Sequence, residues 1–305
     1  MKASLPFWLS GLSIVLVVPF FFVGGPDALS PTLLKDVWNF GHIIFFAVLM
    51  LLVQTFRPLV HWQSWLWVTL LVLGVGVAIE FVQHFVGRES SLDDVLHDLF
   101  GLWLGLFWGQ KPTRTVWALR GLSLLLVTPA FWLVIYSAMA DIVMREQFPQ
   151  VNSFESRFEL AQVRANTRQI KTQQVNSLHT HGAYGLQVEL STQKYAGVSL
   201  FGPYGDWSGY QFLRMDFYNP DTEPLELVLK ISDADHDRHE NRFDDRFNRK
   251  LVLMQGWNQV QIDLNDVRSA PLNREMHMNK ITGMAVFVMQ LPKPREFYWD
   301  NIRLH

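Results

Sequence analysis

Long apolar runs dominate the first 140 residues of this 305-residue chain, and they constrain its fold more than any other feature. Each run is about 17–25 residues long, which is the length that a helix needs to cross the hydrocarbon core of a bilayer. The runs cover residues 5–24, 39–56, 64–86, 93–109 and 116–140. We therefore predict that residues 1–140 form a transmembrane bundle of about five helices.

The first run also has features of a signal peptide, because Lys2 precedes its apolar core. Its core exceeds the usual 7–15 residues, and Val23-Gly24-Gly25-Pro26 is a poor cleavage site, so we favour an uncleaved helix. Basic loops tend to stay in the cytoplasm. One side of the predicted bundle carries Lys2, Arg57, Lys111 and Arg114, and the other carries Lys35, Arg88 and Arg145. We expect a bacterial inner-membrane protein with a cytoplasmic N-terminus and an extracytoplasmic C-terminal half.

Several ionisable residues interrupt the apolar runs, although a charge at the centre of a spanning helix costs about 3 kcal/mol. Residues at spacings of three and four share one helix face. One such face carries Glu80, Gln83, His84 and Gly87, and a second carries Asp94, His97, Asp98 and Gly101. In the predicted topology both faces lie near the outer leaflet. We predict a polar pocket there, with seven candidate ligand-binding residues: His42, Glu80, Gln83, Arg88, Ser91, Asp94 and Asp98.

The chemistry of this predicted pocket stays open between binding and catalysis. Arg88 is suited to hold a phosphate or carboxylate through its bidentate fork, unless it only pairs with Glu80 or Asp94. Glu80, His84 and Asp94 are the candidates for acid–base catalysis. Their spacing matches no standard metal signature, so we predict no metal and no cofactor. Ser91 has a simpler explanation as the N-cap of the helix that carries Asp94.

Glycines extend the second polar face along the fourth predicted helix. Gly101, Gly105 and Gly109 recur at every fourth residue, which is a spacing that lets a neighbouring helix approach closely. We therefore expect this stripe to face another helix of the bundle.

The same residues resemble a known family. Asp36, Asn39 and His42 are followed by the pattern Glu80-x-x-Gln83, Gly87-Arg88-x-x-Ser91-x-x-Asp94-x-x-x-Asp98-x-x-Gly101-x-x-x-Gly105. This pattern, within about residues 10–110, looks like that of the VanZ-like membrane proteins, which are named for an accessory protein of glycopeptide-antibiotic resistance. The family usually has Asn where Asp98 stands. The resemblance implies a multi-pass envelope protein, and it implies no particular reaction.

The second half of the chain has a different pattern. We predict a linker over residues 141–153 and a domain over 154–305 in which apolar and polar residues alternate, as is typical of strands. The expected strands are 154–163, 184–192, 195–201, 210–218, 224–232, 249–254, 257–264, 280–289 and 296–304. Many short strands separated by turn residues favour an antiparallel β-sandwich. The predicted fold class is thus a two-domain membrane protein, an α-helical bundle followed by a sandwich.

Several short motifs of this half resemble the galactose-binding-like jelly rolls of carbohydrate-binding modules. They include Asp206-Trp207-Ser208-Gly209-Tyr210, Gly256-Trp257-Asn258 and Trp299-Asp300-Asn301-Ile302. The resemblance implies a scaffold more than a ligand. We expect Trp207, Trp257 and Phe247 to belong to the core, and we name Tyr195, Tyr204 and Tyr210 as candidate sugar-binding residues.

The acidic loop after residue 232 is a weak candidate for a cation site. Asp233, Asp235 and Asp237 supply the oxygen ligands that Ca²⁺ prefers, but the loop lacks the order of an EF-hand. A solvated charged loop is the default interpretation.

Composition excludes some functions. The chain has no cysteine, which removes disulfides and thiolate chemistry, and a net charge of −2 without a long basic run argues against nucleic acid. The expected partners are the lipid bilayer and an envelope glycan or lipid-linked precursor. Our leading hypothesis is an envelope protein whose pocket recognises an anionic or lipid-linked component and whose sandwich binds its glycan. The alternatives are a membrane-embedded transferase or hydrolase and a membrane-anchored glycan-binding scaffold.

Overall fold

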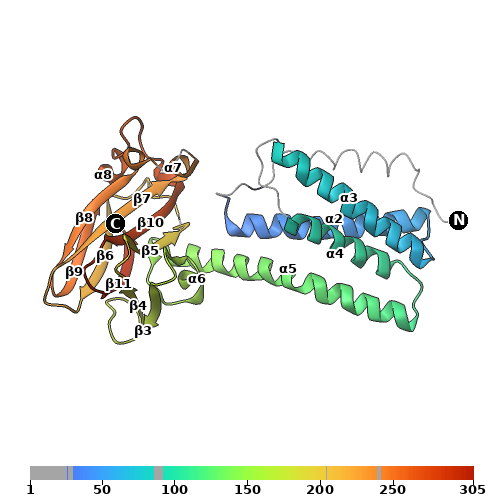
Figure 1. The fold of residues 1–305 in the computed structure, drawn as a ribbon, viewed down its shortest axis with the longest axis horizontal. Coiled ribbons are helices and arrows are strands. Elements are labelled where there is room, and N and C mark those ends of the chain that lie inside the picture. The colour runs from blue at the N-terminus through green and yellow to red at the C-terminus, as the bar shows by residue number, and fades with distance from the viewer. Residues whose placement is uncertain (1–25, 27–29, 86–91, 204, 239–241) are drawn as a thin grey trace. The chain divides into compact units, whose positions relative to one another are not determined.

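The computed structural model describes residues 26, 30–85, 92–203, 205–238 and 242–305, and the chain divides into two compact units, Met1–Met139 and Ala140–His305 (Figure 1). The first predicted helix, residues 5–24, lies outside the described residues. The first unit contains the helices α2 (Thr32–Phe56), α3 (Trp62–Phe85) and α4 (Leu92–Trp108) and most of α5 (Arg114–Gln147), whose last turns belong to the second unit. Among the described residues, three helical segments are long and apolar enough to cross a membrane: Thr32–Phe56, Trp62–Ile79 and Arg114–Gln147.

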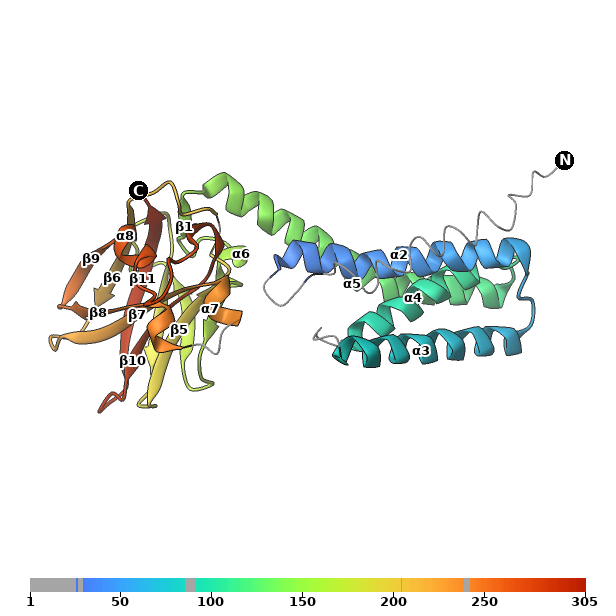
Figure 2. The same ribbon diagram turned by 90° about the horizontal axis from the view of Figure 1, so that it is seen from above.

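Within the first unit, α4 lies between α2 and α3 (Figure 2). Its apolar residues meet α2 in a small buried cluster of Met50, Leu99, Leu102 and Leu106. The outward faces of the helices are also apolar: Trp67 of α3 is 71% exposed and Leu125 of α5 is 69% exposed. Because water would penalise such surfaces, this arrangement suits a bundle surrounded by an apolar medium.

The second unit is a sandwich of two antiparallel sheets, as the alternating pattern predicts. One sheet has the order β3-β4-β11-β6-β9, with β1 also paired to β11, and the other has the order β2-β5-β10-β7-β8. The strands are β1 (Gln150–Asn152), β2 (Val163–Ala165), β3 (Lys171–Val175), β4 (Gly185–Leu190), β5 (Tyr195–Phe201), β6 (Phe212–Asn219), β7 (Leu225–Asp233), β8 (Phe247–Leu253), β9 (Gly256–Asp263), β10 (Ile281–Met289) and β11 (Arg295–Leu304). Short helices α6 (Arg157–Leu160), α7 (Ala234–Arg238) and α8 (Leu264–Arg268) and the 3₁₀ turns η2 (Phe243–Asp245) and η3 (Met278–Lys280) connect them.

Inward-facing residues of both sheets form one apolar core. Phe217 and Trp299 stack in it with ring centroids 5.6 Å apart, and Trp207 is fully buried. The expectation of a core position holds for Trp207 and for Phe247, which is 6% exposed. It is wrong for Trp257, which is 38% exposed because it faces outward on β9.

Two boundaries differ from the predictions. Residues 141–153, predicted as a linker, contain the last turns of α5 and strand β1, because the helical pattern continues to Gln147 and β1 pairs with β11. Residues 154–163, predicted as one strand, contain helix α6. Ser156 caps α6 by accepting from the backbone N–H of Glu159, whose side chain accepts from the backbone N–H of Ser156. This reciprocal capping box outweighs the strand-like alternation.

Candidate functional site

The polar residues of the helical unit centre on one buried pair. His42 of α2 and Asp98 of α4 are 9% and 6% exposed, and Nδ1 of the imidazole lies 2.8 Å from Oδ1 of the carboxylate. A buried carboxylate and a buried imidazole need such a partner, because each loses its hydration in the interior. Two of the predicted pocket residues are therefore brought together by the packing of α2 against α4.

The glycine stripe of α4 makes this contact possible, as its spacing predicts. A Cβ atom at Gly101 would lie 2.3 Å from the carbonyl oxygen of Ile43, and one at Gly105 would lie 2.3 Å from that of Ala47. Only glycine lets the two backbones come so close. The neighbouring helix expected from the sequence is thus α2.

The remaining predicted pocket residues are described to different extents. Asp94 and His97 lie on α4, where both are partly buried, and Nδ1 of His97 is buried without a hydrogen-bond partner. Glu80, Gln83 and His84 lie in the last turns of α3. Arg88 and Ser91 lie outside the described residues.

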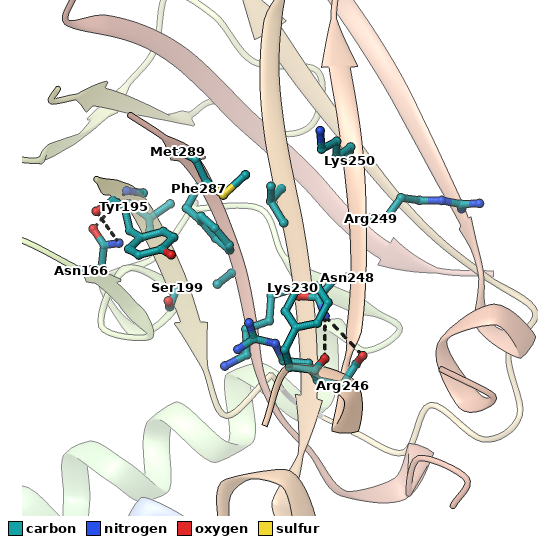
Figure 3. Close-up of a pocket in the computed structure, with 15 residues that line it drawn as sticks. Asn166, Tyr195, Ser199, Lys230, Arg246, Asn248, Arg249, Lys250, Phe287 and Met289 are labelled. Carbon is teal, nitrogen blue, oxygen red and sulfur yellow. Dashed lines mark hydrogen bonds between the residues drawn. The ribbon is translucent and has the colours of Figure 1, made fainter. Parts of the chain in front are cut away.

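The sandwich carries a hollow on the outer face of its five-stranded sheet (Figure 3). Its floor is formed by small outward-facing residues, Ser199 and Gly197 of β5 and Ala285 of β10. Ala285 is paired with Ser199, and Phe287 of β10 is paired with Gly197. A Cβ at Gly197 would lie 2.5 Å from the Cβ of Phe287, so only glycine leaves room for this side chain. The result is a cavity of about 560 Å³, which we call the sheet groove.

Aromatic rings border the sheet groove. Tyr195 is 49% exposed, and its ring meets that of Phe287 edge-on with centroids 6.1 Å apart. Phe243 of η2, which is 71% exposed, lines it as well. Of the three candidate tyrosines, Tyr195 lines the groove, Tyr210 instead packs against Phe148 with centroids 5.5 Å apart, and Tyr204 lies outside the described residues.

Basic side chains also line the sheet groove. Lys230 of β7 is half-buried, and its pKa is lowered first by burial and then by the positive charge of Arg246. Burial also lowers the pKa of Arg246, whose guanidinium lies over the ring of Phe243 at 5.4 Å from its centroid. Arg249 and Lys250 of β8 line the groove further along the strand.

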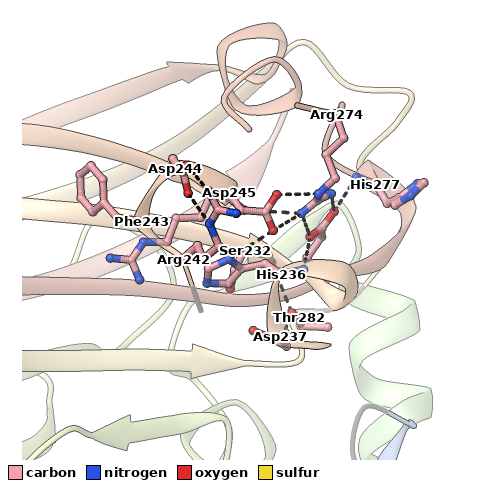
Figure 4. A network of polar contacts seen from close by, with 12 residues as sticks. Ser232, His236, Asp237, Arg242, Phe243, Asp244, Asp245, Arg274, His277 and Thr282 are labelled. Atoms are coloured by element: carbon pink, nitrogen blue, oxygen red, sulfur yellow. Dashed lines mark hydrogen bonds and ion pairs between the residues drawn. The ribbon is translucent and has the colours of Figure 1, made fainter. Parts of the chain in front are cut away.

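A charged network holds the segment that carries Phe243 and Arg246 (Figure 4). Arg274 donates to both carboxylate oxygens of Asp233, at 2.6 and 2.8 Å, and to those of Asp245, at 2.7 and 3.1 Å. Burial alone would raise the pKa of Asp233, but hydrogen bonds from Arg274 and from the backbone N–H groups of His277 and His236 outweigh it and lower the pKa. Arg274 therefore fixes the position of the segment at the groove.

The same network occupies the residues that were candidates for a cation. The carboxylate of Asp233 is fully engaged by Arg274 and backbone N–H groups, and Asp235 lies 3.1 Å from Nε2 of His277. Asp237 accepts a hydrogen bond from Thr282. Among the described residues, no group of three His, Cys, Asp or Glu side chains is arranged to hold a metal ion.

A second aromatic surface lies on the outer face of the six-stranded sheet. Tyr298, Tyr218 and Trp257 are paired in register across β11, β6 and β9. Their rings meet edge-on, with centroids 6.0 Å and 5.3 Å apart. This aromatic row was not recognised in the sequence, although alternation along β9 places Trp257 opposite the buried Ile262 face.

Sequence reasoning also missed most of the residues that line the sheet groove. Lys230 alternates with the buried Leu229 and Ile231, so its outward position was predictable. Arg246, in contrast, follows a turn whose course depends on Asp245 and Arg274, residues far apart in the chain. No local pattern reports such a contact.

Comparison with known proteins identifies the first unit most clearly. Residues 6–109 match the family model VanZ/LLP1, which confirms the resemblance predicted for about residues 10–110. No curated protein matches the sequence.

Several solved structures are similar to the sandwich. A family 11 carbohydrate-binding module from Clostridium thermocellum, in complex with a β-1,3-1,4-mixed-linked tetrasaccharide, is 16% identical with a TM-score of 0.39, over 51% of this chain and 93% of that chain. An exo-β-agarase is 14% identical with a TM-score of 0.39, over 51% of this chain and 24% of that one. An endo-1,4-β-D-xylanase from Clostridium thermocellum, with its CBM22-1 and GH10 modules and xylohexaose, is 13% identical with a TM-score of 0.37. The match covers 51% of this chain and 28% of that chain.

These likenesses concern the fold alone. The chain thus joins a segment that matches the VanZ/LLP1 family model to a β-sandwich of two antiparallel sheets.

Proposed function

We propose that this chain is an integral membrane protein of the bacterial envelope whose helices anchor a glycan-binding β-sandwich outside the cytoplasmic membrane. The sheet groove is the observation that carries this proposal. It combines an exposed tyrosine, Tyr195, with Phe287 and with the polar side chains of Ser199 and Lys230 in one hollow.

This combination suits a sugar. The C–H faces of a sugar ring pack well on aromatic rings, while its hydroxyl groups need donors and acceptors at the ring edge. A cavity of about 560 Å³ also lies within the usual range for small-molecule sites, roughly 300–1,000 Å³. The Tyr195 and Phe287 rings stand at the border of the groove, where a sugar unit can contact both.

The test is binding of oligosaccharides to the full-length protein in nanodiscs, first on a glycan array and then by calorimetry. We expect Tyr195→Ala to weaken binding about tenfold, because it removes one aromatic contact worth roughly 1 kcal/mol or more. Trp257→Ala is the matched control on the opposite sheet, and we expect it to bind like the parent. Loss of binding in the Trp257 variant alone would move the site to the aromatic row, and no binding to any glycan would overturn the proposal.

The membrane topology is part of the same proposal: five spans, a cytoplasmic N-terminus and an extracytoplasmic sandwich. Three apolar helices and the VanZ/LLP1 match support membrane insertion. The absence of cysteine permits a clean test with single-cysteine variants. In intact cells, an impermeant maleimide should label Thr192→Cys of the sandwich but not Lys111→Cys of the α4–α5 loop. The reverse pattern would invert the topology.

A second candidate function belongs to the polar residues of the helical unit. The unpartnered Nδ1 of His97, on the same helix as the His42–Asp98 pair, favours a polar ligand there. We propose that this ligand is an anionic or lipid-linked envelope component, held by Arg88.

Native mass spectrometry should detect this component bound to the parent protein and not to Arg88→Ala. If Glu80→Gln still binds this component but abolishes its turnover, the site is that of a transferase or hydrolase. Identical spectra for the parent and Arg88→Ala would contradict the proposal that Arg88 holds such a component.

A further inference from the structure

The charges that line the sheet groove all have one sign. Its fifteen lining residues include Lys230, Arg246, Arg249 and Lys250, and they include no aspartate or glutamate. Arg249 is paired with Asp266 at 3.4 Å, and its side chain points away from the other groove residues (Figure 3). Three cations are therefore left to act on whatever occupies the groove.

Lys230 and Arg246 both line this hollow. They are close enough for the charge of Arg246 to lower the pKa of Lys230, and the opposing effect of Asp237 is smaller. Two partly buried cations beside each other are unfavourable unless something else compensates them, because both charges are poorly hydrated and repel. An anion between them would relieve both penalties.

Two buried polar atoms of the sheet groove also lack partners. Nε of Arg246, a donor, and Oδ1 of Asn248, an acceptor, are buried without hydrogen bonds. Buried polar groups are normally paired, so unpaired ones commonly mark a place where a ligand or water completes them. Nε of Arg246 can donate to an anionic oxygen, and Oδ1 of Asn248 can accept from a hydroxyl group.

The fold holds these groups in place before any ligand arrives. Nδ2 of Asn248 donates to the carbonyl oxygens of Phe243 and Arg246, at 3.3 and 3.4 Å. Asp245, the residue before Arg246, is linked to Asp233 through hydrogen bonds that Arg274 donates to both. These bonds fix the backbone of the segment, and the guanidinium of Arg246 rests over the ring of Phe243. A guanidinium held in this way loses little conformational freedom on binding, which strengthens recognition.

We propose that the sheet groove binds an acidic glycan, in which a carboxylate, sulfate or phosphate on the sugar lies between Lys230 and Arg246. This inference rests on the proposed glycan-binding function and deepens it. The rings of Tyr195 and Phe287 contact the sugar face, while Arg246 holds the acid through its planar fork. The aromatic border favours a sugar over a bare lipid headgroup, which offers no flat apolar face for the rings.

The experiment uses the full-length protein in nanodiscs of uncharged lipid and three matched pairs of probes. They are hexagalacturonate and its methyl ester, a sulfated carrageenan hexaose and its desulfated form, and a phosphorylated oligomannose and its dephosphorylated form. Glycerol phosphate is the seventh probe, and it stands for a lipid headgroup. Calorimetry at low and high salt gives each dissociation constant.

We expect the acidic member of at least one pair to bind tenfold or more tightly than its neutral partner, and this preference to shrink in high salt. Lys230→Gln and Arg246→Gln should each remove most of the preference, because each weakens binding of the acidic member more than binding of its neutral partner. Arg214→Gln makes the same charge change on β6 of the other sheet, away from the groove, and should behave like the parent. Thermal midpoints of all three variants show whether they remain folded.

The outcomes separate this inference from the function on which it rests. Equal binding of acidic and neutral probes in every pair overturns the acidic ligand but leaves the glycan site intact. An acidic preference that Arg214→Gln abolishes and Lys230→Gln does not would place the charge recognition elsewhere. Binding of glycerol phosphate with no binding of any glycan would overturn both and point to anionic lipid.

Discussion

The helical unit and the sandwich place their apolar side chains in opposite ways. Trp67 of α3 and Leu125 of α5 are 71% and 69% exposed, whereas Trp207 and Trp299 of the sandwich are fully buried. The two units thus use the same kinds of residue for different surroundings. Burial cannot be inferred from residue type alone, because it depends on whether the surface faces water or an apolar medium.

Their polar side chains differ as well. In the helical unit several buried polar groups satisfy one another, although Nδ1 of His97 has no partner. His42 pairs with Asp98, and Gln54 donates to the carbonyl oxygens of Gly105 and Leu106. In the sheet groove, Lys230 and Arg246 face the same hollow without a carboxylate among the lining residues. Internal pairing suits a structural role, while uncompensated charge suits a ligand. Four measurements test this contrast, in order of decreasing expected effect.

The largest difference is expected between two identical substitutions in the two units. Trp207→Ala should reduce the free energy of unfolding by about 3–5 kcal/mol, because it leaves a cavity in the core. Trp67→Ala removes a mostly exposed ring and should change stability by less than about 1 kcal/mol. Thermal and denaturant unfolding of the detergent-solubilised protein gives both values. Equal effects would mean that Trp67 is covered by protein.

Removing one partner of the buried pair in the helical unit should lower the free energy of unfolding by about 3 kcal/mol, because His42→Leu leaves the carboxylate of Asp98 buried without the imidazole. The double variant with Asp98→Leu as well should recover most of this loss. A double-mutant cycle on thermal midpoints measures the coupling. Strictly additive effects would contradict the role of this hydrogen bond.

Close packing between α2 and α4 predicts a smaller effect at one glycine. Gly105→Ala should destabilise the helical unit by about 1–3 kcal/mol, because the new methyl group collides with the carbonyl of Ala47. Gly121→Ala on α5 is the control: no atom lies within 4 Å of the added Cβ, and it should be neutral or stabilising by up to about 1 kcal/mol. Thermal midpoints in one detergent compare the two.

The smallest effect concerns acid sensitivity of the sandwich. Burial, followed by the charges of Lys230 and Arg246, lowers the pKa of His236 below its ordinary 6.5. As the pH falls, the His236 side chain is therefore protonated in the unfolded chain before it is protonated in the folded one. The free energy of unfolding should decrease as the pH drops below about 6.5 towards the lower pKa of the folded state. Unfolding measured between pH 8 and pH 5 should show this slope in the parent and in His179→Leu, whose histidine is exposed. His236→Leu should flatten it, and an unchanged slope would assign the acid response to other groups.

Periodicity was sufficient to predict most of the elements of both units. The runs at 64–86 and 93–109 correspond to α3 and α4, and the alternating segment 224–232 corresponds to β7. Short strands escaped prediction: β1 and β2 have three residues each, too few to show alternation. Where a capping box competed with alternation, at Ser156 and Glu159, the local hydrogen bonds prevailed.

Prediction of the sites was limited by contacts between distant residues. The sequence singled out His42 and Asp98, and the structure pairs them across 56 residues of chain. It also singled out Asp233, but as a cation ligand, because nothing near it in the sequence shows that Arg274 takes up its carboxylate. The groove emerges only when β5, β7, β8 and β10 lie side by side.

The pairing of β11 affects when the sandwich can form during synthesis. This strand lies between β4 and β6 in the centre of its sheet, and it also pairs with β1, the first strand of the unit. Its absence would divide the sheet and remove Phe297 and Trp299 from the core. The ribosome must therefore have released residue 304 before the sheet can close. Until then β4 and β6 lack the strand that lies between them, so this sheet forms only at the end of synthesis.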